Sequence, residues 1–402
     1  MCSYLGSYPA PLARSLICML SDPGDVVFDP FSGRGTTLLE SRLLGRKAVA
    51  SDLNPIAVAL TRAKNSSITL DEARDRLAEL KDRFDPVMYL AEASIQPDEI
   101  QLIFEQFTLA QLCYFRRRLL NSERSVDKFL IGVILGIMHG SVRQDGSSGY
   151  LSISMPNTFS MSPGYVRRYV EKNQLQRVPR NAFDIAAAKV ERLFQDFEPT
   201  ADSGVVATAN VRQLTTNEVL KPYVGMVNLI VTSPPYLDIV NYAKQNWIRN
   251  WLFDDHPEYG SVDDLDDNLI LKDWMSFAEI SVSQMKAMLR PGGVIAMVIG
   301  DVVRTGGAIS LAREFMQRLI HKESFNYIGC LSDRIQSEIK TTRIWKDTKG
   351  QATNVDRIVV LSDETPTFRY HRLAKALFDD STVKIEAITA RQLRREAREF
   401  AY

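Results

Sequence analysis

DVVFDPFSGRGTT, residues 25–37, is the stretch that decides the fold. It begins with an apolar run that is typical of a short buried strand and continues into a helical pattern. Gly33 and Gly35, in the loop between them, would let the backbone approach a ligand closely. Thr36 or Thr37 would cap the N-terminus of the helix. Strand, glycine loop and helix in this order predict the start of a nucleotide-binding βαβ unit.

A carboxylate in the expected place supports this interpretation. Residues 47–51, KAVAS, predict the next strand, which ends in Asp52. A nucleotide-binding βαβ unit places an acid there to accept hydrogen bonds from ribose hydroxyls. The alternative is that Asp52 only caps the helix expected to begin near Pro55.

A second informative stretch lies far along the chain. The apolar residues 227–231, VNLIV, predict a buried parallel strand that runs directly into 232–236, TSPPY. Ligands bind at the carboxyl ends of strands in open α/β sheets. Pro234 and Pro235 fix φ and carry no N–H group, so nearby carbonyl groups can face a ligand, while Tyr236 offers a flat ring for stacking. The alternative is a proline-rich turn closed by a core tyrosine.

Together these motifs resemble those of the S-adenosylmethionine-dependent DNA amino-methyltransferases, which methylate cytosine N4 or adenine N6. DPFSGRGTT is similar to motif I of that family and TSPPY to motif IV, while Ser7–Ala10 resembles motif X and Ser51–Pro55 motif II. The resemblance covers residues 1–65 and 203–362. It implies S-adenosylmethionine as cofactor, double-stranded DNA as substrate and, in a restriction-modification setting, a cognate restriction endonuclease as partner.

The same resemblance implies the residues that contact the cofactor. The strand expected at 205–209 ends in Asn210, where the family often has an acid that contacts the adenine amine; an asparagine still accepts a hydrogen bond but carries no charge. The expected cofactor contacts are Tyr8, Pro9, Asp29, Phe31, Gly33, Gly35, Thr36, Thr37, Asp52, Asn54 and Asn210.

The cysteines favour an exocyclic amine over a ring carbon as methyl acceptor. Methylation at cytosine C5 needs a cysteine nucleophile, and none of the four cysteines follows a proline after a candidate catalytic strand: Cys2, Cys18, Cys113 and Cys330. We expect Ser233 Oγ and the Pro234 carbonyl to accept hydrogen bonds from the amine, beside Pro235, with Tyr236 stacking on a flipped-out base. In the family that these motifs resemble, serine at the position of Ser233 goes more often with cytosine N4, and adenine N6 stays open.

Pattern and length predict an α/β protein with a Rossmann-like seven-stranded methyltransferase sheet and an inserted all-helical domain. A chain of 402 residues exceeds what one core usually fills. Helices are expected at 70–84, 109–120, 126–139 and 182–197, and strands at 25–29, 47–51, 205–209, 227–232, 293–299, 324–331 and 355–361. The expected domains are a catalytic domain at 1–65 and 201–365, a helical, target-recognising insert at 66–200, and a C-terminal helical extension at 366–402.

DNA affinity would have to come from local basic surfaces, because the formal net charge is zero. One candidate surface follows a serine- and glycine-rich stretch, 140–159, that is expected to be an exposed loop. The alternative is that these charges only solvate surface helices and loops. The expected DNA contacts are Arg167, Arg168, Lys172, Arg177, Arg343 and Lys346.

Composition narrows the classes of protein to which the chain could belong. Without an apolar run of membrane-spanning length or a signal peptide, we expect a cytoplasmic protein with no membrane contact. Cysteines without CxxC spacing argue against disulfides and bound metal. Two other functions stay open: an RNA guanine-N2 methyltransferase, which often has aspartate where this chain has Ser233, and a non-catalytic DNA-binding regulator with no need to keep the glycine loop, Asp52 and SPPY together.

Overall fold

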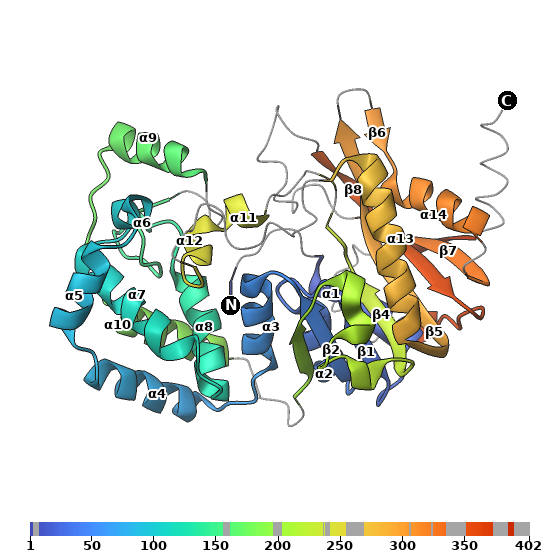
Figure 1. Ribbon diagram of the computed structural model, residues 1–402, viewed down its shortest axis with the longest axis horizontal. Helices are drawn as coiled ribbons and strands as arrows, with labels where there is room; N and C mark the ends of the chain where they lie inside the picture. Colours follow the sequence, from blue (N-terminus) through green and yellow to red (C-terminus); the bar gives the residue numbers. More distant parts are fainter. Residues whose placement is uncertain are drawn as a thin grey trace.

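The computed structural model places a helical body beside a sheet with helices on both faces (Figure 1). It describes residues 1–2, 8–155, 161–195, 203–235, 237, 242–254, 269–304, 307–322, 325–334, 351–372 and 385–389. No helix in this described part of the chain has the length and apolar character of a membrane span.

The sheet has the order β3-β2-β1-β4-β5-β8-β7-β9, with β6 paired to β5. The first five strands in this order, from β3 through β2, β1 and β4 to β5, run parallel to one another. Strand β8 lies antiparallel between β5 and β7. This arrangement confirms the Rossmann-like methyltransferase sheet and the seven expected strands. The strands are β1 (Val26–Asp29), β2 (Lys47–Asp52), β3 (Val205–Thr208), β4 (Val227–Thr232), β5 (Leu289–Arg304), β6 (Gly307–Ile309), β7 (Tyr327–Arg334), β8 (Gln351–Ser362) and β9 (Ile385–Thr389).

The direction in which successive strands are added to the sheet reverses between β1 and β4. Val27 pairs with Leu229 and Phe28 with Ile230, so the two strands are direct neighbours. From β1 the chain builds outward through β2 and β3, and it later returns to add β4 and β5 on the other side. Such a switch point leaves a crevice at the carboxyl ends of the two strands. The glycine loop and the TSPPY turn both start there.

Alternating side chains of the central strands build a core on each face of the sheet. Val27 points toward helix α1 (Ala10–Leu20), where it packs in one buried cluster with Leu12. Phe28 points to the other face and lies in a cluster with Trp274 and Phe315. That face is covered by α13 (Leu271–Met288) and α14 (Leu311–Lys322), with the 3-10 helices η1 (Val211–Thr216) and η2 (Lys221–Tyr223) nearby; η4 (Tyr370–Arg372) contacts α1.

Two helices link the sheet body to the rest. Helix α2 (Thr36–Leu43) follows the glycine loop and packs on β1 and β2, and α3 (Pro55–Asn65) follows β2. One side of α3 contacts β2 and β3, while Ile56 and Leu60 lie in the core of the helical body. Helix α3 therefore packs against both the sheet body and the helical body.

The helical body is built around α8, which is buried along most of its length. The four expected helices are confirmed as α4, α7, α8 and α10. Three further helices, α5, α6 and α9, were not expected because they are short or begin at a proline. The helices are α4 (Leu70–Asp82), α5 (Pro86–Ser94), α6 (Asp98–Ile103), α7 (Gln106–Leu119), α8 (Ser125–Ile137), α9 (Pro163–Asn173), α10 (Ala182–Phe194), α11 (Tyr242–Gln245) and α12 (Trp247–Asn250).

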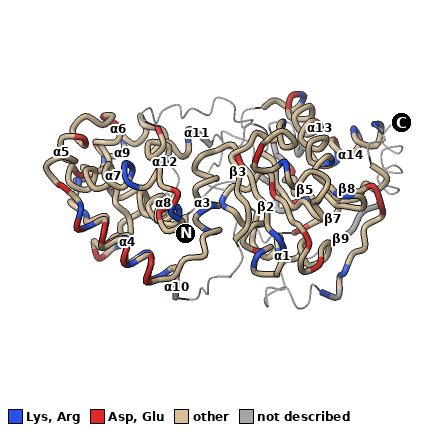
Figure 2. The backbone as a smooth tube through the Cα atoms, turned by 60° about the horizontal axis from the view of Figure 1, so that its bottom comes forward, with Lys and Arg blue, Asp and Glu red and all other residues tan. Residues whose placement is uncertain are grey.

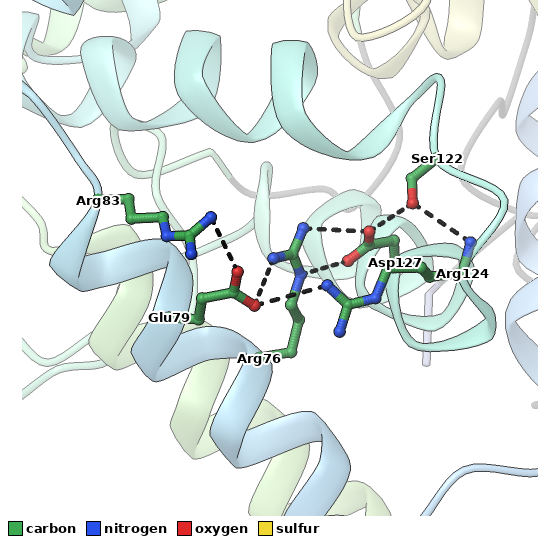
Figure 3. Close-up of polar contacts among 6 residues, drawn as sticks. All are labelled: Arg76, Glu79, Arg83, Ser122, Arg124 and Asp127. Atoms are coloured by element: carbon green, nitrogen blue, oxygen red, sulfur yellow. Dashed lines mark hydrogen bonds and ion pairs between the residues drawn. The ribbon is translucent and has the colours of Figure 1, made fainter.

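A buried ion pair joins α4 to α8 inside this body. Arg76 points from α4 at the carboxylate of Asp127, with its Nε 2.7 Å from Oδ1 and its Nη2 3.1 Å from Oδ2 (Figure 3). Arg76 also contacts Glu79, whose carboxylate meets Arg83 and Arg124. Because the Asp127 side chain is fully buried, this pair fixes how α4 sits on α8.

Two expectations were wrong in part. Residues 385–389 form β9, antiparallel to β7, instead of a helix, because β-branched residues there can extend the edge of the sheet. The stretch 140–159 is not simply an exposed loop, since Leu151, Ile153 and Met155 are buried and the Leu151 amide donates to the Ile137 carbonyl at 2.8 Å. Apolar side chains hold this segment against the end of α8.

Candidate active site

The glycine loop has the backbone shape that its sequence predicts. Gly33 and Gly35 have φ of +50° and +75°, in the left-handed region that favours glycine. A Cβ at Gly35 would lie 3.0 Å from both Cα and Oγ1 of Thr61 on α3. The Thr61 hydroxyl in turn donates to the Gly33 carbonyl at 3.2 Å and lies 3.1 Å from Ser32 Oγ. Sequence reasoning missed Thr61, because a threonine inside a helix carries no local signal for such a contact.

Asp52 lies at the end of β2 and closes the glycine loop. Its Oδ2 accepts from the Gly33 amide at 2.8 Å, and its Oδ1 accepts from the Asn54 amide at 2.9 Å. Burial raises the pKa of the Asp52 carboxyl to about 6, although backbone hydrogen bonds from Asn54, Gly33 and Leu53 favour the charged form. The N-cap of α3 is Asn54, whose side chain accepts from the Ile56 amide at 3.0 Å, so Asp52 is not that cap.

A buried polar cluster joins the ends of β1 and β4. The Thr232 hydroxyl donates to Asp29 Oδ1 at 2.6 Å, and the Phe31 amide donates to the same oxygen at 3.1 Å. Tyr8 donates to Asp29 Oδ2 at 3.4 Å and contacts the Thr37 hydroxyl. Burial raises the pKa of Asp29 to about 6, against the hydrogen bonds that favour its charge. The segments that resemble motifs X, I and IV thus all contribute to the hydrogen bonds around the Asp29 carboxylate.

The TSPPY turn is held from the sheet side. Thr232, its first residue, is fixed by Asp29, and the indole Nε1 of Trp274 on α13 donates to the Pro235 carbonyl at 2.7 Å. Ser233 and Pro235 are partly exposed and Pro234 is buried. Tyr236, the expected stacking residue, lies outside the described residues. The two fixed points place Ser233 and Pro234 directly beyond the end of β4.

The other expected cofactor contacts each have a defined place in the fold. Asn210 follows β3, and its side chain accepts from the Arg212 amide at 3.0 Å as the cap of η1. Phe31 packs edge-on against Phe277, with 5.8 Å between ring centroids. Thr36 is buried at the start of α2, and Pro9 is the N-cap of α1. None of these contacts tests a role in cofactor binding, so each residue stays a prediction.

The expected DNA contacts separate into three groups. Arg167 lies 3.6 Å from a carboxylate oxygen of Glu99, and Arg177 donates to the Gln101 carbonyl at 2.7 Å, so both hold the α9 region against α6. Arg168 and Lys172 are exposed on α9, whose basic residues are visible in Figure 2. Arg343 and Lys346 lie outside the described residues.

No metal centre is evident where the chain is described: no group of three His, Cys, Asp or Glu side chains there is arranged to hold an ion. What the site offers instead is a glycine loop, an acid at a strand end and a serine turn around one crevice.

Comparison with known proteins connects the N-terminal motifs to one family. Residues 3–63 match a DNA methylase family model. A stretch of 54 residues is 44% identical to the Type II methyltransferase M.BamHI of Bacillus amyloliquefaciens and spans 13% of this chain and 13% of that protein. The resemblance to DNA amino-methyltransferases is thereby confirmed, and S-adenosylmethionine is the methyl donor that this family implies.

Two solved structures that match this chain have low sequence identity and low TM-scores. An rRNA methyltransferase, aviRa, from Streptomyces viridochromogenes is 11% identical, with a TM-score of 0.34, 89% of this chain covered and 87% of that one. A precorrin 8w decarboxylase of Methanobacterium thermoautotrophicum is 10% identical, with a TM-score of 0.32 and coverages of 90% and 96%.

Proposed function

We propose that this protein is a DNA methyltransferase that transfers a methyl group from S-adenosylmethionine to the exocyclic amine of a base flipped out of a duplex. The observation that carries the proposal is the hydrogen bond between Asp29 and Thr232, 2.6 Å long. It joins the glycine loop after β1 to the serine turn after β4, so a ligand on the loop and a base at the turn would share one crevice. The N-terminal family match supports the same activity.

The residues at these strand ends suit S-adenosylmethionine. The Asp52 carboxylate accepts backbone hydrogen bonds from Gly33, Asn54 and Leu53, and its two oxygens together have further lone pairs for ribose hydroxyls. The left-handed glycines set the shape of the loop, and Thr61 holds that shape. When bound, the cofactor supplies an electrophilic methyl group on a sulfonium. Asp52 and Asn210 would orient it from neighbouring strand ends.

At the turn, Ser233 Oγ and the Pro234 carbonyl would accept hydrogen bonds from the base amine. These bonds would favour an amine lone pair drawn out of conjugation with the ring, which could then accept the methyl group from the sulfonium as the methyl–sulfur bond breaks and a neutral thioether leaves. Tyr236 would stack on the flipped base. The proton leaves to water after transfer. Serine at position 233 favours cytosine N4 as acceptor, and adenine N6 is the alternative.

The helical body would supply DNA contacts from α9. This helix is anchored by the buried Val166 and exposes Arg168 and Lys172. Tyr165 and Tyr169 stack on the same helix, with 6.1 Å between their rings. Basic and aromatic side chains on one exposed helix suit phosphate contacts with a local, salt-dependent affinity. The Type II relative supports a restriction-modification context with a cognate endonuclease as partner.

The test is to incubate the protein with labelled S-adenosylmethionine and either duplex DNA or tRNA, then identify the modified nucleoside by mass spectrometry. We expect N4-methylcytosine in DNA. N6-methyladenine would correct only the base, whereas label in RNA alone or in neither pool would refute the proposal. Absence of S-adenosylmethionine binding, tested separately, would favour the non-catalytic regulator.

Cofactor binding should depend on pH through Asp52. Ribose hydroxyls need the carboxylate as acceptor, and the pKa of Asp52 in the free protein is about 6. Affinity for S-adenosylmethionine, measured by calorimetry, should be constant above pH 7 and fall about tenfold per pH unit well below 6. Asp52→Asn should bind weakly without this slope. If the slope persists in Asp52→Asn, another group titrates, Asp29 included.

Gly35→Ala should weaken cofactor binding. An L-residue at φ +75° is strained by about 1–2 kcal/mol, and the new Cβ would press on Thr61 at 3.0 Å and shift the loop. We expect at least a tenfold rise in the Kd for S-adenosylmethionine. Gly24→Ala is the matched control, because Gly24 has φ +89° but open space around it. Equal Kd values for the two variants would show that the loop shape does not matter for binding.

A further inference from the structure

Helix α13 carries two buried aromatic residues one turn apart. Trp274 is fully buried and Phe277 is 2% exposed, and both belong to the core cluster that contains Phe28 of β1. Figure 1 shows α13 lying along one face of the sheet. Because residues three positions apart lie on the same side of a helix, the two rings reach neighbouring parts of the sheet body.

The Phe277 ring contacts residues that follow two different strands, β1 and β3. It packs edge-on against Phe31 of the glycine loop, with 5.8 Å between the ring centroids. The guanidinium of Arg212, which follows β3, lies 5.1 Å from the centroid of the same ring. The Arg212 amide in turn donates to Asn210 Oδ1 at 3.0 Å. One buried ring is therefore shared by two loops that carry expected cofactor contacts, Phe31 and Asn210.

Trp274 holds the third loop at this edge of the sheet, the TSPPY turn. Its indole donates to the Pro235 carbonyl at 2.7 Å, while Thr232 at the start of the turn donates to Asp29 Oδ1. The same oxygen accepts from the Phe31 amide at 3.1 Å. These contacts form a closed ring: Phe31 is joined through Asp29 to the turn, and the turn is joined through α13 back to Phe31.

We propose that α13 aligns the glycine loop with the TSPPY turn, with Phe277 as a positioning residue for S-adenosylmethionine and Trp274 as a positioning residue for the methyl acceptor. The inference rests on the proposed function. A Phe31 ring that is already held by Phe277 needs little reordering when the cofactor binds, which lowers the entropy cost of binding. Trp274 acts in the same way on the turn that presents Ser233 and the Pro234 carbonyl. One helix thereby sets the methyl donor and the acceptor in a fixed geometry.

The test compares Phe277→Leu with Trp274→Phe by calorimetry and by methyl transfer to duplex DNA. Phe277→Leu removes the ring between Phe31 and Arg212 and keeps an apolar side chain, so the Kd for S-adenosylmethionine should rise about fivefold to tenfold. Its kcat at saturating cofactor should fall by less than about threefold, a smaller change than that in Kd. Trp274→Phe removes the donor to the Pro235 carbonyl and should lower kcat about tenfold, with Kd within about threefold of wild type.

Phe325→Leu is the matched control. Phe325 lies in the same buried cluster and also has a cation over its ring, Lys286 Nζ at 4.8 Å, but Lys286 lies in the last turn of α13. That end of α13 leads into the start of β5, where Leu289 pairs with Val227 at the amino ends of the strands, opposite to the glycine loop. Phe325→Leu should therefore lower the melting temperature about as much as Phe277→Leu does, and keep Kd and kcat within about threefold of wild type.

Three outcomes would overturn the inference: a wild-type Kd in Phe277→Leu, a wild-type kcat in Trp274→Phe, or the same pattern of changes in both variants, which would indicate only a general need for the packing of α13. Should Phe277→Leu not fold, hydrogen exchange of the wild-type protein decides instead. S-adenosylmethionine should then slow exchange in residues 274–278 as well as in 31–37, and protection of 31–37 alone would contradict the role of α13. A wild-type protein that binds S-adenosylmethionine but methylates no DNA would refute the proposed function, and the change in Kd would still decide the role of Phe277.

Discussion

Ser233→Ala should lower the rate of methyl transfer by about 10²-fold or more while binding of S-adenosylmethionine stays nearly intact. Loss of one preorganised polar contact to a reacting group typically costs this much in kcat. Ser233 sits beyond β4 between two residues of the turn, Thr232 and Pro235, that Asp29 and Trp274 hold. Removing the hydroxyl leaves Gly33, Gly35 and the Asp52 carboxylate untouched.

The measurement is single-turnover transfer of labelled methyl to duplex DNA, with calorimetry for cofactor affinity. Ser281→Ala is a suitable control, because that buried hydroxyl donates only to the Phe277 carbonyl within α13, at 2.8 Å. We expect Ser281→Ala to keep the wild-type rate. A wild-type rate in Ser233→Ala would remove this hydroxyl from the mechanism, and the Pro234 carbonyl would remain as the proposed acceptor.

Local patterns were enough to predict seven of the nine strands that the structure describes, all except β6 and β9. Each of β1, β2 and β4 is a short apolar run ended by a polar residue, and such runs are recognisable without knowledge of their neighbours. Gly33 and Gly35 were predicted for the same reason, because positive φ is a property of single residues. The seven strands and the glycine loop therefore follow from the sequence.

Contacts between distant residues were not predictable in the same way. Thr232 and Asp29 are 203 positions apart, and only the pairing of β1 with β4 brings them together. The cofactor contact of Asp29 stays a prediction, but the hydrogen bonds that its buried carboxylate accepts from Thr232 and Tyr8 could not be predicted from the sequence. Similarly, α12 reads as part of the catalytic half by position, and only its packing places it in the helical core. Contacts between side chains that are far apart in the sequence can be predicted only when the fold is known.

Stability of the helical body should depend strongly on Asp127. Asp127→Ala would leave the Arg76 guanidinium without its main partner in a site where the Arg76 side chain is only 10% exposed. Breaking a buried ion pair by removing one partner costs about 3–5 kcal/mol, because the remaining charge stays desolvated. We expect a loss of this size in the free energy of unfolding, measured by urea titration.

Helix α4 offers a matched control for this prediction. Arg74 makes an equally bidentate pair with Glu191, at 2.7 and 2.8 Å, but both side chains are about half exposed. Glu191→Ala should therefore cost less than about 1 kcal/mol, because water replaces the lost partner. Replacing both members of the buried pair, as Arg76→Met with Asp127→Leu, should recover much of the stability lost in Asp127→Ala. Equal losses for Asp127→Ala and Glu191→Ala would mean that burial does not control the strength of the Arg76 pair, and the contact between α4 and α8 would then rest on apolar packing alone.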